Sequence, residues 1–250
     1  MKKYPLTPED RAFIKKAVAR YQANLDIFIA LGQALFTVIT QSSSLAEHMH
    51  SVKFRAKDPK HLAIKLKRKI EERSREKWGI NEENLFQKVN DLVGLRILHL
   101  HTSQIEKIDL ALRSCLAGEK YKKVEGPTAK TWDLDYKNYF QSIGIRTEES
   151  PRQYTSVHYV FSARNDLKLT FEIQVRTLAE ELWGEVDHQI NYPEKHKAVA
   201  CKEQIAVLAR VTSSCTRLVD SLVRSKNEYD EGSKRRKLRR KKSRSGNKNS

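Results

Sequence analysis

The segment from Leu167 to Val175 constrains the fold most, because its side chains alternate between apolar and polar residues. Successive side chains of a β-strand point to opposite faces, so this pattern predicts a strand with one buried face. The polar side chains of the segment include Glu172 and Gln174, and Arg176 continues the alternation. A second alternating segment, Tyr154 to Ala163, precedes it and is expected to pair with it.

Helical and strand patterns mix along the rest of the chain without a regular strand–helix–strand repeat. Leu95 to Leu100 predicts a buried strand, while Ile105 to Leu116 and Thr177 to Asn191 have helical periodicity. Residues 118–150 are polar and mixed, and we expect long loops or an insertion there. This mixture predicts an α+β domain.

Long helices are expected at both ends. Thr7 can cap a helix whose first position is Pro8, and apolar residues at helical spacing predict one continuous amphipathic helix to about Thr40. A basic helix is expected from Lys60 to Lys77, and a last amphipathic helix from about His196 to Val223. The predicted division is an N-terminal helix (1–44), a central domain (45–195), a C-terminal helix (196–231) and a tail (232–250).

Basic charge is concentrated in the tail. The 250 residues include 48 Lys and Arg against 31 Asp and Glu, a formal charge of +17, and ten of the basic residues follow Gly232. Only Leu238 is apolar in that stretch, so we expect residues 232–250 to be disordered. Such a run can be merely solubilising, or it can bind RNA or the ribosome, and the sequence leaves both open.

The environment of the chain can also be predicted from composition. The three cysteines are widely spaced with no CxxC pair, which argues against a disulfide framework and favours a reducing cytoplasm. No apolar run approaches the roughly 20 residues of a membrane-spanning helix, and the first residues lack the apolar core of a secretory signal. We therefore expect a cytoplasmic protein without a membrane partner.

Two acidic residues stand where strands could bring them together: Asp91 just before the strand at Leu95, and Glu172 within the alternating strand. The polar face of that strand could be plain solvent exposure, or the two carboxylates could hold Mg²⁺, which prefers oxygen ligands and often keeps substrate phosphates in its shell. Cations suited to phosphate are available at Arg55, Lys57, Lys65, Arg68 and Arg96. A P-loop is not expected, since GxxxxGK[ST] is lacking.

Four motifs in order resemble the RelA/SpoT-type alarmone synthetase domain. They are the basic segment from Arg55 to Arg68, DLVGLRI from Asp91, YTSVH from Tyr154, and EIQVRTLAEELWGEVDH from Glu172, the last followed by Asn191-Tyr192. The resemblance covers about residues 45–193 and implies a nucleotidyltransferase-like mixed sheet flanked by helices. It also implies a small, single-domain enzyme that transfers pyrophosphate from ATP to the 3′-hydroxyl of GDP or GTP, releasing AMP.

The resemblance implies a role for each matching residue. Arg55 and Arg96 would flank the adenine, and Lys57, Lys65 and Arg68 would hold the ATP phosphates. Asp91 and Glu172 would bind Mg²⁺, with Glu172 also the candidate base. Tyr154 would stack on the guanine, supported by His158 and Gln174.

Departures from the family pattern bear on the acceptor. Gln153 stands where the family usually has Gly, His61 replaces a Ser, and the basic residues near the acceptor phosphates would be Arg146 or Arg152. An alternative acceptor is therefore the 3′ CCA end of tRNA, as in toxic relatives of this kind. A third interpretation is an inactive nucleic-acid-binding relative. The sequence also leaves open a homo-oligomer and an antitoxin partner.

Overall fold

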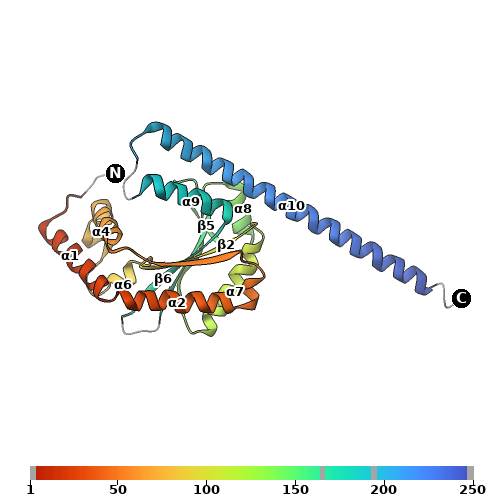
Figure 1. Ribbon diagram of the computed structural model, residues 1–250, viewed down its shortest axis with the longest axis horizontal. Coiled ribbons are helices and arrows are strands. Elements are labelled where there is room, and N and C mark those ends of the chain that lie inside the picture. The colour runs from red at the N-terminus through yellow and green to blue at the C-terminus, as the bar shows by residue number, and fades with distance from the viewer. Residues whose placement is uncertain (1–3, 164–166, 193–195, 247–250) are drawn as a thin grey trace.

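A six-stranded mixed sheet forms the centre of the computed structural model, which describes residues 4–163, 167–192 and 196–246, with side chains as far as Lys237 (Figure 1). The strand order is β1-β2-β6-β5-β3-β4, with β2/β6 and β3/β4 parallel and the other pairs antiparallel. The strands are β1 (Ser51–Ala56), β2 (Val93–His99), β3 (Lys122–Thr131), β4 (Arg146–Glu149), β5 (Ser156–Ser162) and β6 (Thr170–Thr177).

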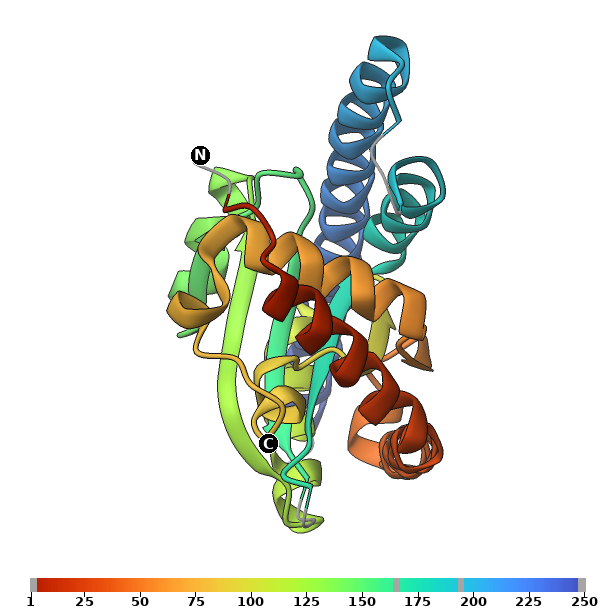
Figure 2. The ribbon, with the colours of Figure 1, turned by 90° about the vertical axis from the view of Figure 1, so that its left-hand side faces the viewer.

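Helices cover both faces of this sheet. In Figure 1, α2 and α7 lie on one side, and α9 and α10 lie on the other; Figure 2 shows the strands side by side. The helices are α1 (Pro8–Ala23), α2 (Leu25–Gln41), α3 (Ser43–Ala46), α4 (Pro59–Arg73), α5 (Arg75–Trp78), α6 (Leu85–Lys88), α7 (Gln104–Gly118), α8 (Leu134–Ser142), α9 (Leu178–Asn191) and α10 (Val199–Gly246). The predicted α+β class and mixed sheet flanked by helices are confirmed.

The N-terminal segment is two helices rather than the single one predicted. Thr7 caps α1 as expected, accepting from the Asp10 backbone N–H at 3.1 Å. At Asn24 the backbone leaves the helical conformation, and α1 and α2 meet at 57°. The Asn24 side chain donates to the Arg20 carbonyl at 2.8 Å, which satisfies a carbonyl at the end of α1. The bend lets Tyr21 and Phe28 pack edge to face in one core. It depends on this tertiary packing, which the periodicity of the sequence cannot reveal.

The polar segment 118–150 is also more regular than expected, because it holds β3, α8 and β4. At the other end, α10 continues to Gly246, so the prediction of disorder from residue 232 is wrong for residues 232–246; residues 247–250 lie outside the described part. Lys and Arg are good helix formers, and no proline interrupts this stretch. The low apolar content of this segment indicates that it has no hydrophobic core of its own. It does not prevent the segment from forming a helix.

Among the described residues, no single helix is long and apolar enough to cross a membrane. The bent pair α1–α2 reaches the required length and composition only when both helices are taken together. Phe13, Tyr21, Phe28 and Leu35 from this pair are buried in the core of the sheet domain.

Candidate active site

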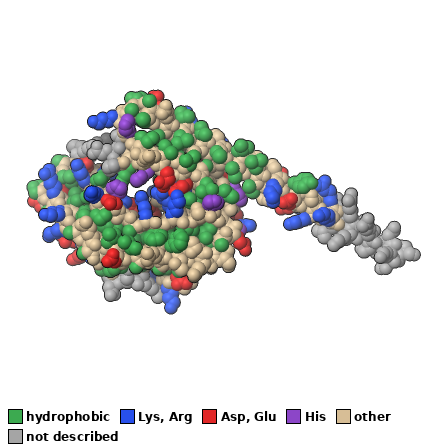
Figure 3. Space-filling view, in the orientation of Figure 1, with side chains coloured by type: hydrophobic (Ala, Val, Ile, Leu, Met, Phe, Trp, Pro, Cys, Tyr) green, Lys and Arg blue, Asp and Glu red, His purple; other side chains and the backbone are tan. Residues whose placement is uncertain are grey.

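Two adjoining cavities lie on the face of the sheet covered by α9. Figure 3 shows basic, acidic and histidine side chains gathered around a hollow on this face. The first cavity, of about 250 Å³, is lined by Lys53, Phe54, Arg55, Asp91, Gly94, Leu95, Arg96, Glu172, Gln174 and Glu185. The second, of about 180 Å³, is lined by Arg96, Arg152, Tyr154, His158, Gln174, Arg176, Trp183, Gly184, Asp187, His188, Asn191 and Tyr192. Arg96 and Gln174 line both cavities, which therefore form one cleft.

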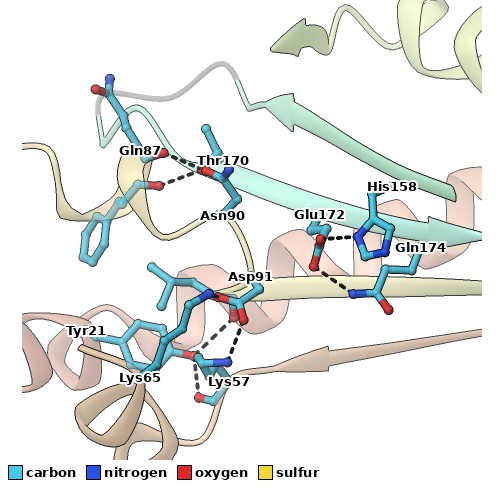
Figure 4. Close-up of polar contacts among 12 residues, drawn as sticks. Tyr21, Lys57, Lys65, Gln87, Asn90, Asp91, His158, Thr170, Glu172 and Gln174 are labelled. Atoms are coloured by element: carbon cyan, nitrogen blue, oxygen red, sulfur yellow. Dashed lines mark hydrogen bonds and ion pairs between the residues drawn. The ribbon is translucent and has the colours of Figure 1, made fainter. Parts of the chain in front are cut away.

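Strand register brings the predicted carboxylates to the same cavity. The parallel pairing of β2 with β6 sets Gly94 beside Glu172, and Asp91 lies just before β2. Asn90, which precedes Asp91, is fixed by the Thr170 hydroxyl of β6 at 3.0 Å (Figure 4). A Cβ atom at Gly94 would have nothing within 4 Å, so the floor beside Glu172 is open.

Two lysines hold Asp91 in this structure. Lys57 Nζ lies 2.8 Å from one carboxylate oxygen and Lys65 Nζ lies 2.6 Å from the other (Figure 4). Burial opposes ionisation of Asp91, but the two lysine charges outweigh it and hold its pKa well below the usual range. Burial is also the main cause of the lowered pKa of Lys57, and Asp91 partly offsets it. The Tyr21 hydroxyl donates to the Lys57 carbonyl at 2.7 Å, so α1 anchors this end of the cleft.

Glu172 is held by two donors. It accepts from His158 Nδ1 at 2.7 Å and from Gln174 Nε2 at 2.9 Å (Figure 4). Burial would raise the pKa of Glu172, but these contacts lower it to about 2. Glu172 is therefore ionised at neutral pH, the state in which a carboxylate binds a metal ion.

The residues present fit a magnesium ion that is only partly ligated by protein. No three His, Cys, Asp or Glu side chains gather into a metal-binding group in the described ranges. Asp91 and Glu172 supply carboxylate oxygens on either side of the open floor, which suits Mg²⁺ because it commonly takes one or two carboxylates and completes its shell with water and phosphate.

Sequence reasoning missed the acidic network around Arg96. Glu181, only 7% exposed in its side chain, lies 3.2 Å from Lys53 and 3.3 Å from Arg96, and also contacts Arg176. Arg96 additionally contacts Glu185. Glu181 thus joins cations from β1, β2 and β6 and orients Arg96 at the boundary of the two cavities. Glu181 lies within the EIQVRTLAEELWGEVDH motif, but the motif did not indicate this role, since paired acids near a helix start are usually exposed.

An aromatic platform borders the second cavity. Tyr154 stacks on Trp183 with ring centroids 5.8 Å apart and planes at 20°. Trp183 is itself fixed by donating to the Ile205 carbonyl of α10 at 3.1 Å. Gln153 has a φ of 62°, a conformation that glycine adopts at lower cost, so the backbone here has the shape that the expected family glycine would favour.

A second aromatic cluster, also missed, bridges α4 and α9. The Tyr192 ring lies 4.4 Å from His61 and 4.4 Å from His188, centroid to centroid. Burial is the main cause that lowers the pKa of His188, and the charge of Arg55 lowers it further, so that charge acts on this cluster. His61, which departs from the family pattern, packs here against Tyr192, which lines the second cavity.

Three further basic residues were predicted to contact the nucleotides, and of these only Arg152 lines a cavity. Arg68 lines neither cavity and lies 3.7 Å from Glu72 one turn along α4. Arg146 pairs with Glu148 at 2.5 Å on the exposed strand β4. Arg152 lines the second cavity and lies 3.6 Å from Asp187. Arg152 is therefore the better placed of the two for an acceptor phosphate.

Comparisons with known proteins identify the family and the fold. Residues 54–197 match the family model described as the region found in RelA / SpoT proteins. No curated protein sequence matches the chain.

Solved structures share the fold at low sequence identity. A GTP pyrophosphokinase family protein from Streptococcus pneumoniae is 17% identical, with a TM-score of 0.62 over 84% of this chain and 96% of that one. Small alarmone synthetase 1 from Bacillus subtilis, bound to its product pppGpp, is 18% identical, with a TM-score of 0.60 over 84% of this chain and 98% of that one. The same enzyme bound to AMPCPP is 17% identical, with a TM-score of 0.59 over 84% and 99% of the two chains.

Proposed function

Because this chain belongs to the RelA/SpoT family, we propose that it is a pyrophosphotransferase that uses ATP and GTP or GDP to make pppGpp or ppGpp. The observation that supports this most is the joined pair of cavities, which share Arg96 and Gln174 and of which the first is lined by both Asp91 and Glu172. The relatives bound to AMPCPP and to pppGpp have the same fold.

The first cavity is the proposed ATP site. Arg55 and Arg96 line it, and a guanidinium plane stacks well on a purine. Lys57 and Lys65 would hold the phosphates, which offer them anionic oxygens in place of the Asp91 carboxylate. Binding of ATP would thereby release Asp91. Arg68 would have to turn from Glu72 to join them.

The second cavity is the proposed acceptor site. Tyr154 would stack on guanine with its other face backed by Trp183, and Arg152 would meet the acceptor phosphates. Gln174, shared by both cavities, keeps Glu172 turned toward the junction, and His158 does the same from β5.

The transfer itself requires one bond to form and one to break. The 3′-oxygen of the acceptor forms a bond to the β-phosphorus of ATP as the bond from that phosphorus to the α,β-bridging oxygen breaks, and AMP leaves with that oxygen. The hydroxyl proton goes to a base, for which Glu172 is the candidate. Bound Mg²⁺, held by Asp91 and Glu172, would neutralise phosphate charge. The protein otherwise contributes alignment and cations.

Label transfer tests the proposal and its acceptor together. The protein is incubated with ATP labelled in the γ-phosphate and, separately, with GTP, GDP or deacylated tRNA, and the labelled product and AMP are measured. We expect label in the guanine nucleotide with equal release of AMP. Label only in tRNA would replace the acceptor, and label in none of the three would contradict the enzyme proposal.

A further inference from the structure

A small enclosed chamber adjoins the proposed acceptor site. Its volume is about 20 Å³, and residues of β2, β5, β6, α7, α8, α9 and α10 line it. Tyr136 of α8, Arg176 of β6 and Glu180 of α9 belong to this lining. Arg176 also lines the second cavity of the cleft. The chamber and the acceptor site therefore share a side chain.

Three buried polar atoms of these lining residues have no hydrogen-bond partner in the part of the chain that the structure describes. They are Glu180 Oε1, the Tyr136 hydroxyl and Arg176 Nε. The three residues are only 2%, 6% and 7% exposed, so bulk solvent does not satisfy these atoms. Buried polar groups nearly always have a partner, and a water molecule needs about 10–15 Å³ and two to four polar neighbours. The chamber meets both requirements for one water molecule.

The other oxygen of Glu180 holds the backbone of the acceptor site. Glu180 Oε2 accepts from the Thr155 backbone N–H at 3.0 Å. Thr155 directly follows Tyr154, whose ring lines the second cavity and stacks on Trp183. One carboxyl group thus links the chamber to the ring that is proposed to stack on the acceptor base.

A negative charge on Glu180 is poorly tolerated in this chamber. Burial is the main cause that raises the pKa of Glu180 to about 7; Arg176 lowers it and Asp133, at the start of α8, raises it. The charge of Arg176 is shared, because Arg176 also contacts Glu181. His99 of β2 is neutral at pH 6 to 8, since burial lowers its pKa to about 4.

Tyr136 is neutral in the same range, because burial raises its pKa. The other residues that line the chamber are uncharged. An ionised Glu180 would therefore need more hydration than a chamber for one water molecule supplies.

We propose that the chamber binds one water molecule and that Glu180, bridged by it to Tyr136 and Arg176, is a proton-dependent positioning residue for the acceptor site. Neutral Glu180 donates from Oε1 to the water and accepts the Thr155 N–H at Oε2. The water also accepts from Arg176 Nε–H and donates to the Tyr136 hydroxyl. Loss of the proton opens the chamber to solvent and releases Thr155 and Tyr154. Acceptor binding, which rests on the proposed function, then weakens.

Hydrogen exchange of the Thr155 amide in the full-length protein tests the positioning without any nucleotide. After correction for the intrinsic rate, exchange should be about ten-fold faster at pH 8 than at pH 6, because the neutral fraction of Glu180 falls by that factor around a midpoint of about 7. Glu180→Gln should show no such rise, since the amide stays neutral. Equal corrected rates at the two pH values in the parent would overturn the proposal.

Two tyrosine variants test the water. Tyr136→Phe removes one of its partners, so the water stabilises the ionised form less well and the midpoint of the exchange profile should rise by about half a pH unit. Tyr139→Phe is the matched control, because the Tyr139 hydroxyl donates to the Thr102 carbonyl at 3.3 Å and Tyr139 does not line the chamber. Equal midpoints in the two variants would overturn the water bridge.

Steady-state kinetics test the consequence for the acceptor. From pH 6 to pH 8, the KM for GTP should rise about ten-fold more in the parent than in Glu180→Gln, while the KM for ATP should change equally in both. The comparison cancels the titration of the nucleotides themselves. An equal change in the KM for GTP would overturn the link to the acceptor site. If GTP gains no label at all, the proposed function fails, and the exchange measurement still decides on the chamber.

Discussion

At the scale of single residues, Glu172 has two proposed roles, as a ligand of Mg²⁺ and as the candidate base. Glu172→Gln removes the charge and keeps the volume, and the amide oxygen can still accept from His158. We expect the free energy of unfolding to change little and pyrophosphate transfer to fall by at least about 100-fold, because the negative charge that would hold the metal is lost. Labelled product from ATP and GTP measures the loss, and Glu83→Gln, on the exposed surface, is the control. Near-parental transfer by Glu172→Gln would remove this residue from the mechanism.

Glu180 gives a prediction for pH. It is 2% exposed, and its Oε2 accepts from the Thr155 backbone N–H at 3.0 Å, next to Tyr154. Burial is the main cause that raises the pKa of Glu180 from 4.5 to about 7. The folded state therefore keeps this proton to a higher pH than the unfolded chain, and stability is lost as pH rises from about 4.5 through 7, by up to about 3 kcal/mol.

Glu180→Gln should abolish that loss, because the amide stays neutral and its oxygen can still accept from Thr155. Urea unfolding at pH 5 and pH 8 measures the effect, with Glu83→Gln as the control for an exposed carboxylate. We expect the variant and the parent to be similar at pH 5 and the variant to be more stable at pH 8. Equal pH dependence of the two proteins would contradict the assignment.

The residues that sequence reasoning could place are those on regular strands. Alternation along β6 put Glu172 and Gln174 on one face, and both line the cleft. Glu181 and Trp183 could not be found in this way, because their importance comes from contacts with β1, β2 and α10 that no local pattern encodes. Arg68 was predicted from the sequence to contact the ATP phosphates, but in the structure it lies next to the Glu72 carboxylate, one turn along α4.

At the scale of elements, α4 depends on the residue that caps it. Asp58 caps this helix by accepting from the backbone N–H groups of Lys60 and His61 at 2.8 and 3.1 Å. The His61 N–H is the main cause of the lowered pKa of Asp58. Asp58→Ala should cost about 1 kcal/mol of stability. Fraying of the first turn would also disturb Lys57 and Lys65, so we expect a higher KM for ATP with a smaller change in kcat.

Steady-state kinetics at varied ATP, together with urea unfolding, measure both effects of Asp58→Ala. Asp58→Asn is the matched variant, because asparagine caps helices about as well as aspartate and should restore most of the parental behaviour. A loss of stability without any change in KM would show that the cap acts on folding alone.

Element boundaries were less predictable than element types. Periodicity correctly indicated helix on both sides of Asn24, but the bend depends on packing between α1, α2 and the sheet. Segment 118–150 contains β3, whose pairing with β5 has register shifts between Lys123 and Thr128. These irregularities interrupt the alternation that marks a strand, so the polar sequence resembles a loop.

At the scale of the whole molecule, the basic tail is separated in space from the proposed active site. Figure 1 shows α10 running away from the domain that holds the cleft, and six of the ten tail cations follow Lys237. Deleting residues 238–250 keeps every residue of the two cavities. We therefore expect unchanged transfer to GTP. The truncated chain should bind single-stranded RNA more weakly and with a shallower salt dependence. The slope of log affinity against log salt concentration should fall by about 0.7 for each phosphate that the protein no longer neutralises.

RNA binding at several salt concentrations, measured beside the transfer assay, checks both parts of this expectation. An equal salt slope in the two proteins would show that these cations bind no phosphates, whereas a loss of transfer to GTP would tie the end of the chain to the cleft.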